Sequence, residues 1–347
     1  FRKVHQQQVL KPQAMAERSL RIRRLYLDLT GLPPSAEQMH DVRPWAEIVD
    51  ELLLSPHHGE RWARHWMDIW RYSDWYGLGA QLRYSQKHLW HWRDWIVESL
   101  NQDKGYDRMI REMLAGDELD PTNPNVVRAT GFLARNYYLF NRTTWLDSTI
   151  EHTGKAFLGL TLNCAKCHDH KYDPFSAADY YQLRAIFEPH QVRLDPVPGT
   201  TDLESDGLPR VFDDHLDAVT YVHRKGDPAN PDTSVEIKPG IPAIFARDAA
   251  AIEEIPLPLS AYAPIARDYV QKDLTDRAED RVMAARKELQ RLQSEVQSQP
   301  PTAKSAEKPD KSVAVADDAA AFQVTDDFSV ANSDLWNIVG DGWKYAD

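Results

Sequence analysis

Both cysteines of the 347-residue chain lie in one short run, Cys164-Ala-Lys-Cys167-His168. The chain is therefore not a small disulfide-stapled scaffold, and its fold has to come from apolar packing. A hydrophobic content of 42% at this length is enough for at least one substantial core. The same run carries the clearest chemistry in the sequence.

The spacing Cys-x-x-Cys-His is the attachment signature of c-type haem. Two thiols about one helical turn apart can each add to a vinyl group of haem, and the next imidazole then lies beneath the iron as its proximal ligand. We therefore predict that Cys164 and Cys167 hold haem c covalently and that His168 binds its iron. Because this attachment takes place outside the cytoplasm, we expect a periplasmic or extracellular protein of the cell envelope.

Two other roles of the cysteine pair stay open at this point. A thioredoxin-like dithiol would need a strand before the motif in a βαβ setting, whereas residues 153–162 have helical spacing. A zinc site would recruit Cys164, Cys167 and His170 together with one more ligand. The absorbance spectrum separates both alternatives from haem.

The second axial ligand of the iron is expected upstream of the motif. The only later methionine is Met283, inside a charged helical segment, so a histidine is favoured. His65 is the preferred metal ligand because Asp68 shares its helical face and would orient the imidazole. The other candidates are an open or water-bound position and His88, His91, His152 and His190.

The hydrophobic pattern predicts a mainly α chain in five parts. Residues 1–195 indicate a helical c-type haem domain, and residues 196–267 a loop-rich segment with short strands. Residues 268–298 have the charged pattern and thin apolar stripe typical of a two-stranded coiled coil or of a helix lying on a domain. Residues 299–321 have the composition of a disordered linker, and residues 322–347 resemble the truncated start of a lectin-like β-sandwich.

Tryptophans at helical spacing are expected mostly in the core of the first part, at Trp62, Trp66, Trp70, Trp90, Trp92 and Trp95.

Charge and motif content exclude several classes of protein. The net charge of −12 argues against nucleic-acid binding, which requires a positive surface. No apolar run approaches the length of about 18 residues that a transmembrane segment needs. We find no phosphate-binding loop, nucleophile elbow or zinc-protease helix, and we assign no catalytic residue. The chain begins at Phe1 without a signal-peptide pattern, which we interpret as a processed or partial chain.

Several stretches together resemble a known family, the cytochrome-associated domain of large planctomycetal multidomain (planctomycete cytochrome c) proteins. The resemblance extends over about residues 15–245 and is carried by residues 25–34, 55–68, 156–174, 224–228 and 238–240. It implies an exported redox protein of the cell envelope, often associated with polysaccharide use, and it supplies no reaction. It also implies Cys164, Cys167 and His168 as the haem residues.

The expected function is thus that of an extracytoplasmic c-type cytochrome, which carries one haem and exchanges electrons with other cytochromes or redox subunits of a larger assembly. The first alternative is a haem oxidoreductase that acts on a polysaccharide or a small oxidant. The second is a glycan-binding scaffold with a structural metal.

Overall fold

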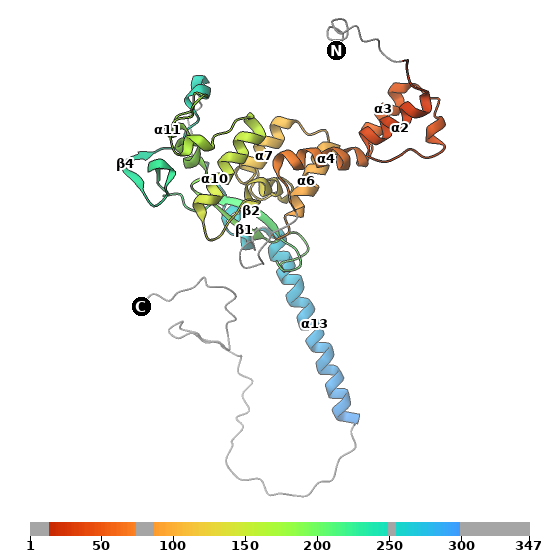
Figure 1. Ribbon diagram of the computed structural model, residues 1–347. Helices are drawn as coiled ribbons and strands as arrows, with labels where there is room; N and C mark the ends of the chain where they lie inside the picture. The colour runs from red at the N-terminus through yellow and green to blue at the C-terminus, as the bar shows by residue number, and fades with distance from the viewer. Residues whose placement is uncertain (1–13, 74–86, 249–254, 299–347) are drawn as a thin grey trace, which may run out of the picture. The chain divides into compact units, whose positions relative to one another are not determined.

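The computed structural model describes residues 14–73, 87–248 and 255–298 (Figure 1). Helices dominate these residues and the strands form two short antiparallel pairs, which confirms the predicted mainly α fold. The chain divides into two compact units, residues 1–287 and 288–347. The predicted linker and sandwich segments, 299–321 and 322–347, lie outside the described residues.

The described helices are α2 (Arg18–Leu29), α3 (Trp45–Leu53), α4 (Pro56–Trp70), α6 (Trp90–Asn101), α7 (Tyr106–Leu119), α8 (Pro124–Val127), α9 (Gly131–Ala134), α10 (Arg142–Thr153), α11 (Ala177–Phe187), α12 (Leu259–Tyr262) and α13 (Asp268–Ser298). Shorter helical turns are η1 (Gln38–His40), η3 (Arg128–Thr130), the π-helical η4 (Gly154–Leu158), η5 (Asn163–Lys166), η6 (Arg224–Gly226), η7 (Ala243–Asp248) and η8 (Pro264–Ala266). The strands are β1 (His190–Asp195), β2 (Leu208–Asp213), β3 (Thr220–His223) and β4 (Pro231–Ile237).

Helices α4 and α11 both begin at side-chain caps. At α4, the Ser55 hydroxyl accepts a hydrogen bond from the N–H of His57, and Pro56 occupies the first turn. At α11, Ser176 and Asp179 form the reciprocal bonds of a capping box. Each cap satisfies N–H groups that a helix start would otherwise leave without a partner.

The main core is rich in tryptophan, as predicted, but not every tryptophan belongs to it. Trp70, Trp92 and Trp95 are at most 1% exposed. Trp62 is instead 40% exposed and Trp90 36% exposed, because each lies on the outer face of its helix and contacts a neighbouring histidine ring. The expectation that the tryptophans lie mostly in the core is therefore confirmed, and Trp62 and Trp90 are the exceptions.

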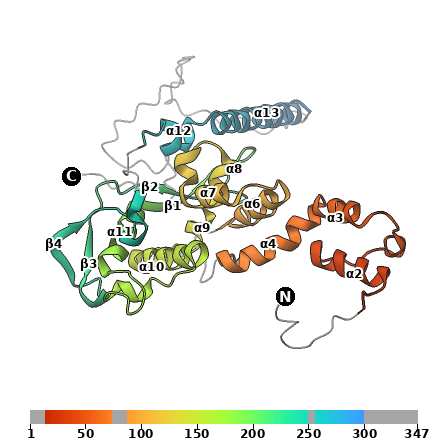
Figure 2. The same ribbon diagram turned by 90° about the horizontal axis from the view of Figure 1, so that it is seen from above.

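The first hairpin joins the helical part of the chain to the strand-rich part. β1 pairs with β2 in antiparallel register from His190 opposite Asp213 to Asp195 opposite Leu208. Figure 2 shows this hairpin beside α9, and β3 and β4 beside α11, in agreement with their contacts. The β1–β2 hairpin therefore contains residues from both sides of the predicted boundary at position 195.

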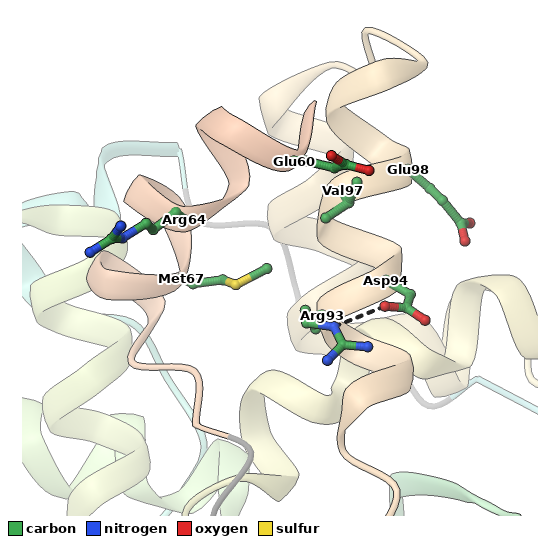
Figure 3. Close-up of a pocket in the computed structure, with 7 residues that line it drawn as sticks. All are labelled: Glu60, Arg64, Met67, Arg93, Asp94, Val97 and Glu98. Atoms are coloured by element: carbon green, nitrogen blue, oxygen red, sulfur yellow. Dashed lines mark hydrogen bonds and ion pairs between the residues drawn. The ribbon is translucent and has the colours of Figure 1, made fainter. Parts of the chain in front are cut away.

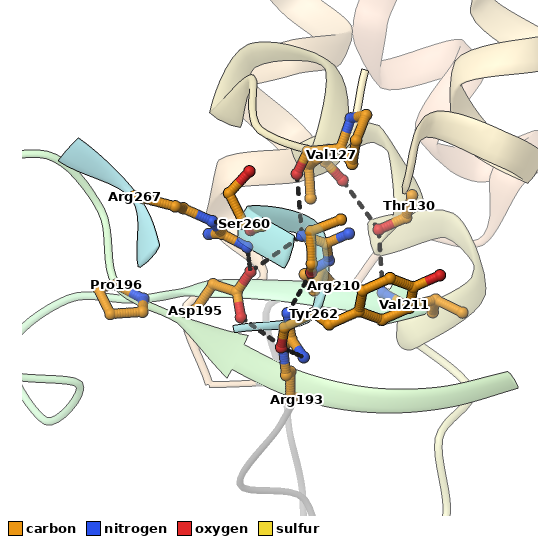
Figure 4. Close-up of polar contacts among 12 residues, drawn as sticks. Val127, Thr130, Arg193, Asp195, Pro196, Arg210, Val211, Ser260, Tyr262 and Arg267 are labelled. Carbon is orange, nitrogen blue, oxygen red and sulfur yellow. Dashed lines mark hydrogen bonds and ion pairs between the residues drawn. The ribbon is translucent and has the colours of Figure 1, made fainter. Parts of the chain in front are cut away.

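A buried carboxylate with three arginines, which we call the Asp195 cluster, fixes the segment before α13 to this hairpin (Figure 4). The Asp195 side chain is 0% exposed and lies 2.6 Å from Arg193 Nε, 3.2 Å from Arg210 Nη1 and 2.7 Å from Arg267 Nη2. Burial alone would raise the pKa of Asp195, but the three guanidinium groups hold it below its usual value. Removing the Asp195 carboxylate would leave the buried guanidinium groups of Arg210 and Arg267 without this counter-charge, which costs about 3–5 kcal/mol.

No helix within the described ranges has both the length and the apolar character that crossing a bilayer would require.

The carboxyl group of Asp117 makes stability depend on pH. Asp117 is only 4% exposed, and burial raises its pKa from 3.8 to about 7. The folded chain therefore holds this proton to a higher pH than the unfolded chain does. The resulting stabilisation is complete below about pH 4 and is lost as the pH rises towards 7.

We predict that Asp117→Asn removes most of this pH dependence, because the amide has no proton to lose. A shift of about three pKa units corresponds to at most about 4 kcal/mol of unfolding free energy. Urea unfolding followed by circular dichroism, repeated between pH 5 and pH 8 in steps of about one pH unit, measures how the unfolding free energy depends on pH. Asp28→Asn, at an exposed position of α2, is the control that should leave the slope unchanged. An equal slope in wild type and Asp117→Asn would contradict the assignment.

Candidate functional site

The cysteine motif forms a single helical turn with two different faces. The N–H groups of Cys167 and His168 both donate to the carbonyl oxygen of Cys164, at 3.2 and 3.4 Å. This geometry places Cys164, Cys167 and His168 on one side of the turn. All three are exposed, and the two cysteines are not bonded to each other.

The opposite face of this turn belongs to the main core. Ala165, between the cysteines, is 0% exposed, and Leu162, just before the turn, is 2% exposed. The turn is thus held by burial on one side while both thiols stay accessible on the other. Residues three and four positions apart share one face of a helical turn, so Cys164, Cys167 and His168 lie together and Ala165 lies on the other face.

The imidazole of His168 has one nitrogen engaged and one free to act as a ligand. Nδ1 lies 2.8 Å from the carbonyl oxygen of Asp169. A carbonyl oxygen only accepts hydrogen bonds, so Nδ1 carries the proton. The lone pair is then on Nε2, the arrangement in which a histidine binds a metal through that atom.

Polar contacts link Lys166 of the motif to two helices. Lys166 Nζ lies 2.6 Å from Asp147 Oδ2 on α10, and the Tyr180 hydroxyl donates to Asp147 Oδ1 at 2.7 Å. The Tyr181 hydroxyl, also on α11, donates to the Lys166 carbonyl oxygen at 3.0 Å. Burial raises the pKa of Tyr181 to about 12, so this donor keeps its proton at neutral pH.

A turn far along the chain lies directly against the sulfur of Cys167. Between β3 and β4, Lys225 (φ 55°) and Gly226 (φ 74°) are both left-handed, and Asp227 N–H closes the turn on the Arg224 carbonyl oxygen at 3.2 Å. A Cβ atom at Gly226 would lie 2.4 Å from Cys167 Sγ, well inside contact distance. Only glycine therefore fits here, for reasons of both conformation and space.

Gly226 is a residue that the sequence analysis did not assign to the site. The Lys-Gly-Asp-Pro run does predict a turn, and the family resemblance includes residues 224–228. Neither signal says that the turn contacts a cysteine about sixty positions earlier in the printed sequence. His223, next to this turn, packs its ring edge-on to Tyr181 with centroids 5.3 Å apart.

The predicted second ligand, His65, is not in contact with the motif. It lies on the exposed face of α4, and its ring meets Trp62 at 5.5 Å. Within the described residues, no hydrogen bond or ion pair joins His65 to Asp68 or to the motif. Its role as a ligand stays a prediction.

The other candidate histidines have partners or are enclosed. His88 Nε2 lies 2.9 Å from the Leu203 carbonyl oxygen, and His91 Nε2 lies 2.7 Å from Asp206 Oδ1. Burial lowers the pKa of His152 to about 4 and that of His190 to about 3, so both imidazoles are neutral at physiological pH.

His170 accepts a local hydrogen bond beside the motif. Its Nδ1 accepts a hydrogen bond from the Asp173 N–H at 2.9 Å, and Asp169 Oδ1 accepts from the N–H of Ala177 at the start of α11. In the described ranges, no three His, Cys, Asp or Glu side chains converge as a metal cluster would. The ligands of the zinc alternative, Cys164, Cys167 and His170, are thus not assembled there.

Figure 3 shows an open cleft between α4 and α6, whose lining does not include the motif residues. Met67 and Val97 contribute apolar surface to it, and the Arg93 and Asp94 side chains that line it pair with each other at 3.0 Å. Glu98, on its rim, pairs with Arg128. Nothing in these contacts indicates the chemistry of a ligand, so we assign none to this cleft.

The donor set of the motif fits covalent haem. It offers two reduced, accessible sulfurs on one face of one turn and an imidazole whose Nδ1 proton is held by a carbonyl oxygen. These are the atoms that thioether formation and axial ligation would use.

We predict that Gly226→Ala raises the reactivity of Cys167 but not that of Cys164. The added methyl group would collide with Cys167 Sγ and displace the turn that packs against one side of this exposed residue. Loss of a contact that restrains the thiol by about 1.4 kcal/mol would speed its alkylation about tenfold. Iodoacetamide labelling of the haem-free full chain, followed by peptide mass spectrometry, reports each cysteine separately.

Gly199→Ala is the control, since Gly199 is also left-handed (φ 95°) but has nothing within 4 Å of an added Cβ. It should leave both labelling rates unchanged. If Cys167 reacts at the wild-type rate in Gly226→Ala, the contact with the turn does not exist in solution.

Comparison with known proteins places the chain in a family. The model of the protein family of unknown function DUF1549 (PSCyt2) matches residues 1–192, more than half of the 347 residues. The match includes the cysteine motif and ends before the β3–β4 turn. Neither the curated proteins nor the solved structures gave a match. The accessible cysteine turn therefore belongs to a member of the DUF1549 (PSCyt2) family.

Proposed function

We propose that the chain is an extracytoplasmic c-type cytochrome, with one haem attached at Cys164 and Cys167, that transfers electrons within a larger redox assembly. The observation that carries this proposal is the exposed face shared by Cys164, Cys167 and His168 on a turn whose other face is buried. The sequence resemblance to planctomycete cytochrome proteins supports the same proposal.

The attachment chemistry needs only atoms that this turn offers. Each thiol would add its sulfur to one carbon of a vinyl group and its hydrogen to the other, so the addition would consume no oxidant. His168 would hold the iron through Nε2, because the Asp169 carbonyl oxygen already engages Nδ1 of the ring. When bound, haem supplies a one-electron Fe(III)/Fe(II) couple.

The polar surroundings of the motif have a positioning role in this proposal. Lys166, Tyr180 and Tyr181 form polar contacts with the motif and with Asp147, and these contacts hold the turn in place. The exposure of both thiols leaves one side of the site open to a partner. We propose other cytochromes or redox subunits as partners, in the periplasm or outside the cell, with polysaccharide as a further binding partner of the assembly.

We predict that wild-type protein, produced with a c-type maturation system, gains the mass of one haem. Cys164→Ala with Cys167→Ala should gain none, because no sulfur remains to form a thioether. His168→Ala should also lose the attachment, whereas His170→Ala, two positions further on, should keep it. Intact-protein mass spectrometry under denaturing conditions is the measurement.

A wild-type chain that emerges without this mass increment, while a known c-type cytochrome is loaded in the same cells, would rule the proposal out. Stoichiometric zinc on the same chain would favour the structural-metal alternative.

We predict that His65→Ala converts the visible spectrum of the haem-loaded protein from low-spin to high-spin, since one strong axial ligand is lost. His57→Ala is the matched control on the same helix, because His57 Nδ1 pairs with Glu60 at 2.8 Å. It should leave the spectrum unchanged.

If the His65→Ala spectrum equals that of wild type and both are high-spin and bind cyanide, the sixth position is open. Such a result would reject His65 as a ligand and favour the haem oxidoreductase alternative.

A further inference from the structure

The long helix α13 carries a regular apolar row that the described structure leaves uncovered. Starting at Ala278, apolar residues recur at alternating steps of four and three positions, which is the a/d pattern of a coiled coil. We call these residues the α13 seam: Ala278, Val282, Ala285, Leu289 and Leu292. The larger ones are exposed, Val282 by 49%, Leu289 by 55% and Leu292 by 46%.

The chain's own contacts with α13 lie on another face of the helix. Val270 is 3% exposed, Asp273 Oδ2 accepts a hydrogen bond from the Gly199 N–H at 2.8 Å, and Arg277 donates to the Thr201 hydroxyl. In the heptad that places Val282 at an a position, these three residues occupy c and f positions, opposite the a/d row. Packing of the first turns against the domain therefore leaves the seam facing away.

We propose that the α13 seam pairs with the same seam of a second copy of this chain, as an antiparallel two-stranded coiled coil. The helices would overlap along their length, with the two-fold axis between Met283 and Ala284. Ala278 then faces Leu289 of the second copy, and Val282 faces Ala285 of the second copy.

Side-chain size favours this arrangement. The antiparallel register sets one alanine against one larger residue in each central layer, so the spacing between the helices stays even. A parallel pair in register would instead set Ala278 on Ala278 and Leu289 on Leu289 of the second copy. Because the leucine layers hold the helices apart, the alanine layers between them would leave gaps.

Charges beside the seam favour the same orientation. In the antiparallel pair, Arg281 lies beside Glu288 of the second copy and Glu279 beside Arg286 of the second copy, each twice by symmetry. In a parallel pair, Arg281 would lie beside Arg286 of the second copy, also twice. Exposed pairs of this kind contribute little affinity individually, but they select the orientation of coiled coils.

Sedimentation velocity of the full chain over a range of concentrations tests the pairing. Wild type should show a monomer–dimer equilibrium. Val282→Asp should shift it to monomer, whereas Met283→Asp, at the neighbouring position that is 60% exposed and outside the seam, should keep the dimer. Circular dichroism checks that both variants keep the helix content of wild type.

A wild-type chain that stays monomeric at every concentration overturns the proposal. A dimer that survives Val282→Asp also overturns the proposal, because a surface other than the α13 seam then holds it together.

Charge reversal tests the orientation. Arg286→Glu should weaken the antiparallel dimer about tenfold, since two attractive pairs become repulsive. Adding Glu279→Arg in the same chain should restore the wild-type dissociation constant. A parallel dimer would respond in the opposite sense, because Arg286→Glu turns its Arg281–Arg286 repulsion into attraction. A tighter dimer in Arg286→Glu therefore overturns the antiparallel proposal.

Discussion

The separation of one helical turn into a buried and an exposed face is the constraint on which the proposed chemistry depends. Ala165 and Leu162 anchor the turn in the core, and the same turn directs Cys164, Cys167 and His168 outward. Placing a bulky or charged residue at position 165 would not alter any reacting atom. It would still disrupt the site, because the face that holds the turn in place would no longer fit the core.

Residues beyond the family match contribute to the same site. The DUF1549 match ends at residue 192, yet the β3–β4 turn rests Gly226 on the Cys167 sulfur. The β1–β2 hairpin and the Asp195 cluster tie this later part of the chain to the helices. We infer that the strand-rich segment is a structural partner of the helical part that carries the cysteine motif. The motif would lose one of its supports if the chain were cut after residue 195.

Local features were predictable from the sequence and long-range contacts were not. The caps at Ser55 and Ser176 are of this local kind, because each follows from residue type and spacing over a few positions. The contact of Gly226 with Cys167 depends on how distant segments pack, for which a single sequence offers no periodic signal. Exposure of Trp62 was missed for a related reason, because helical spacing identifies a face but not what covers it.

The candidate site divides in the same way. The motif residues could be named from their spacing alone, since the chemistry proposed for them operates within one turn. The second ligand depends on tertiary structure, and His65, chosen for its neighbour Asp68, has no contact with either Asp68 or the motif in the described residues. The heptad row of α13 was visible as a thin apolar stripe, but its exposure on the side away from the domain required the structure.

The most direct test of the central claim is tandem mass spectrometry of the proteolytic peptide that contains residues 164–168. The full chain is matured in the cell and extracted with acidified solvent, which removes any non-covalent haem. The account predicts one haem that stays on this peptide, bonded to the sulfurs of both Cys164 and Cys167. A peptide recovered with two free thiols, or with a disulfide between them, would contradict it.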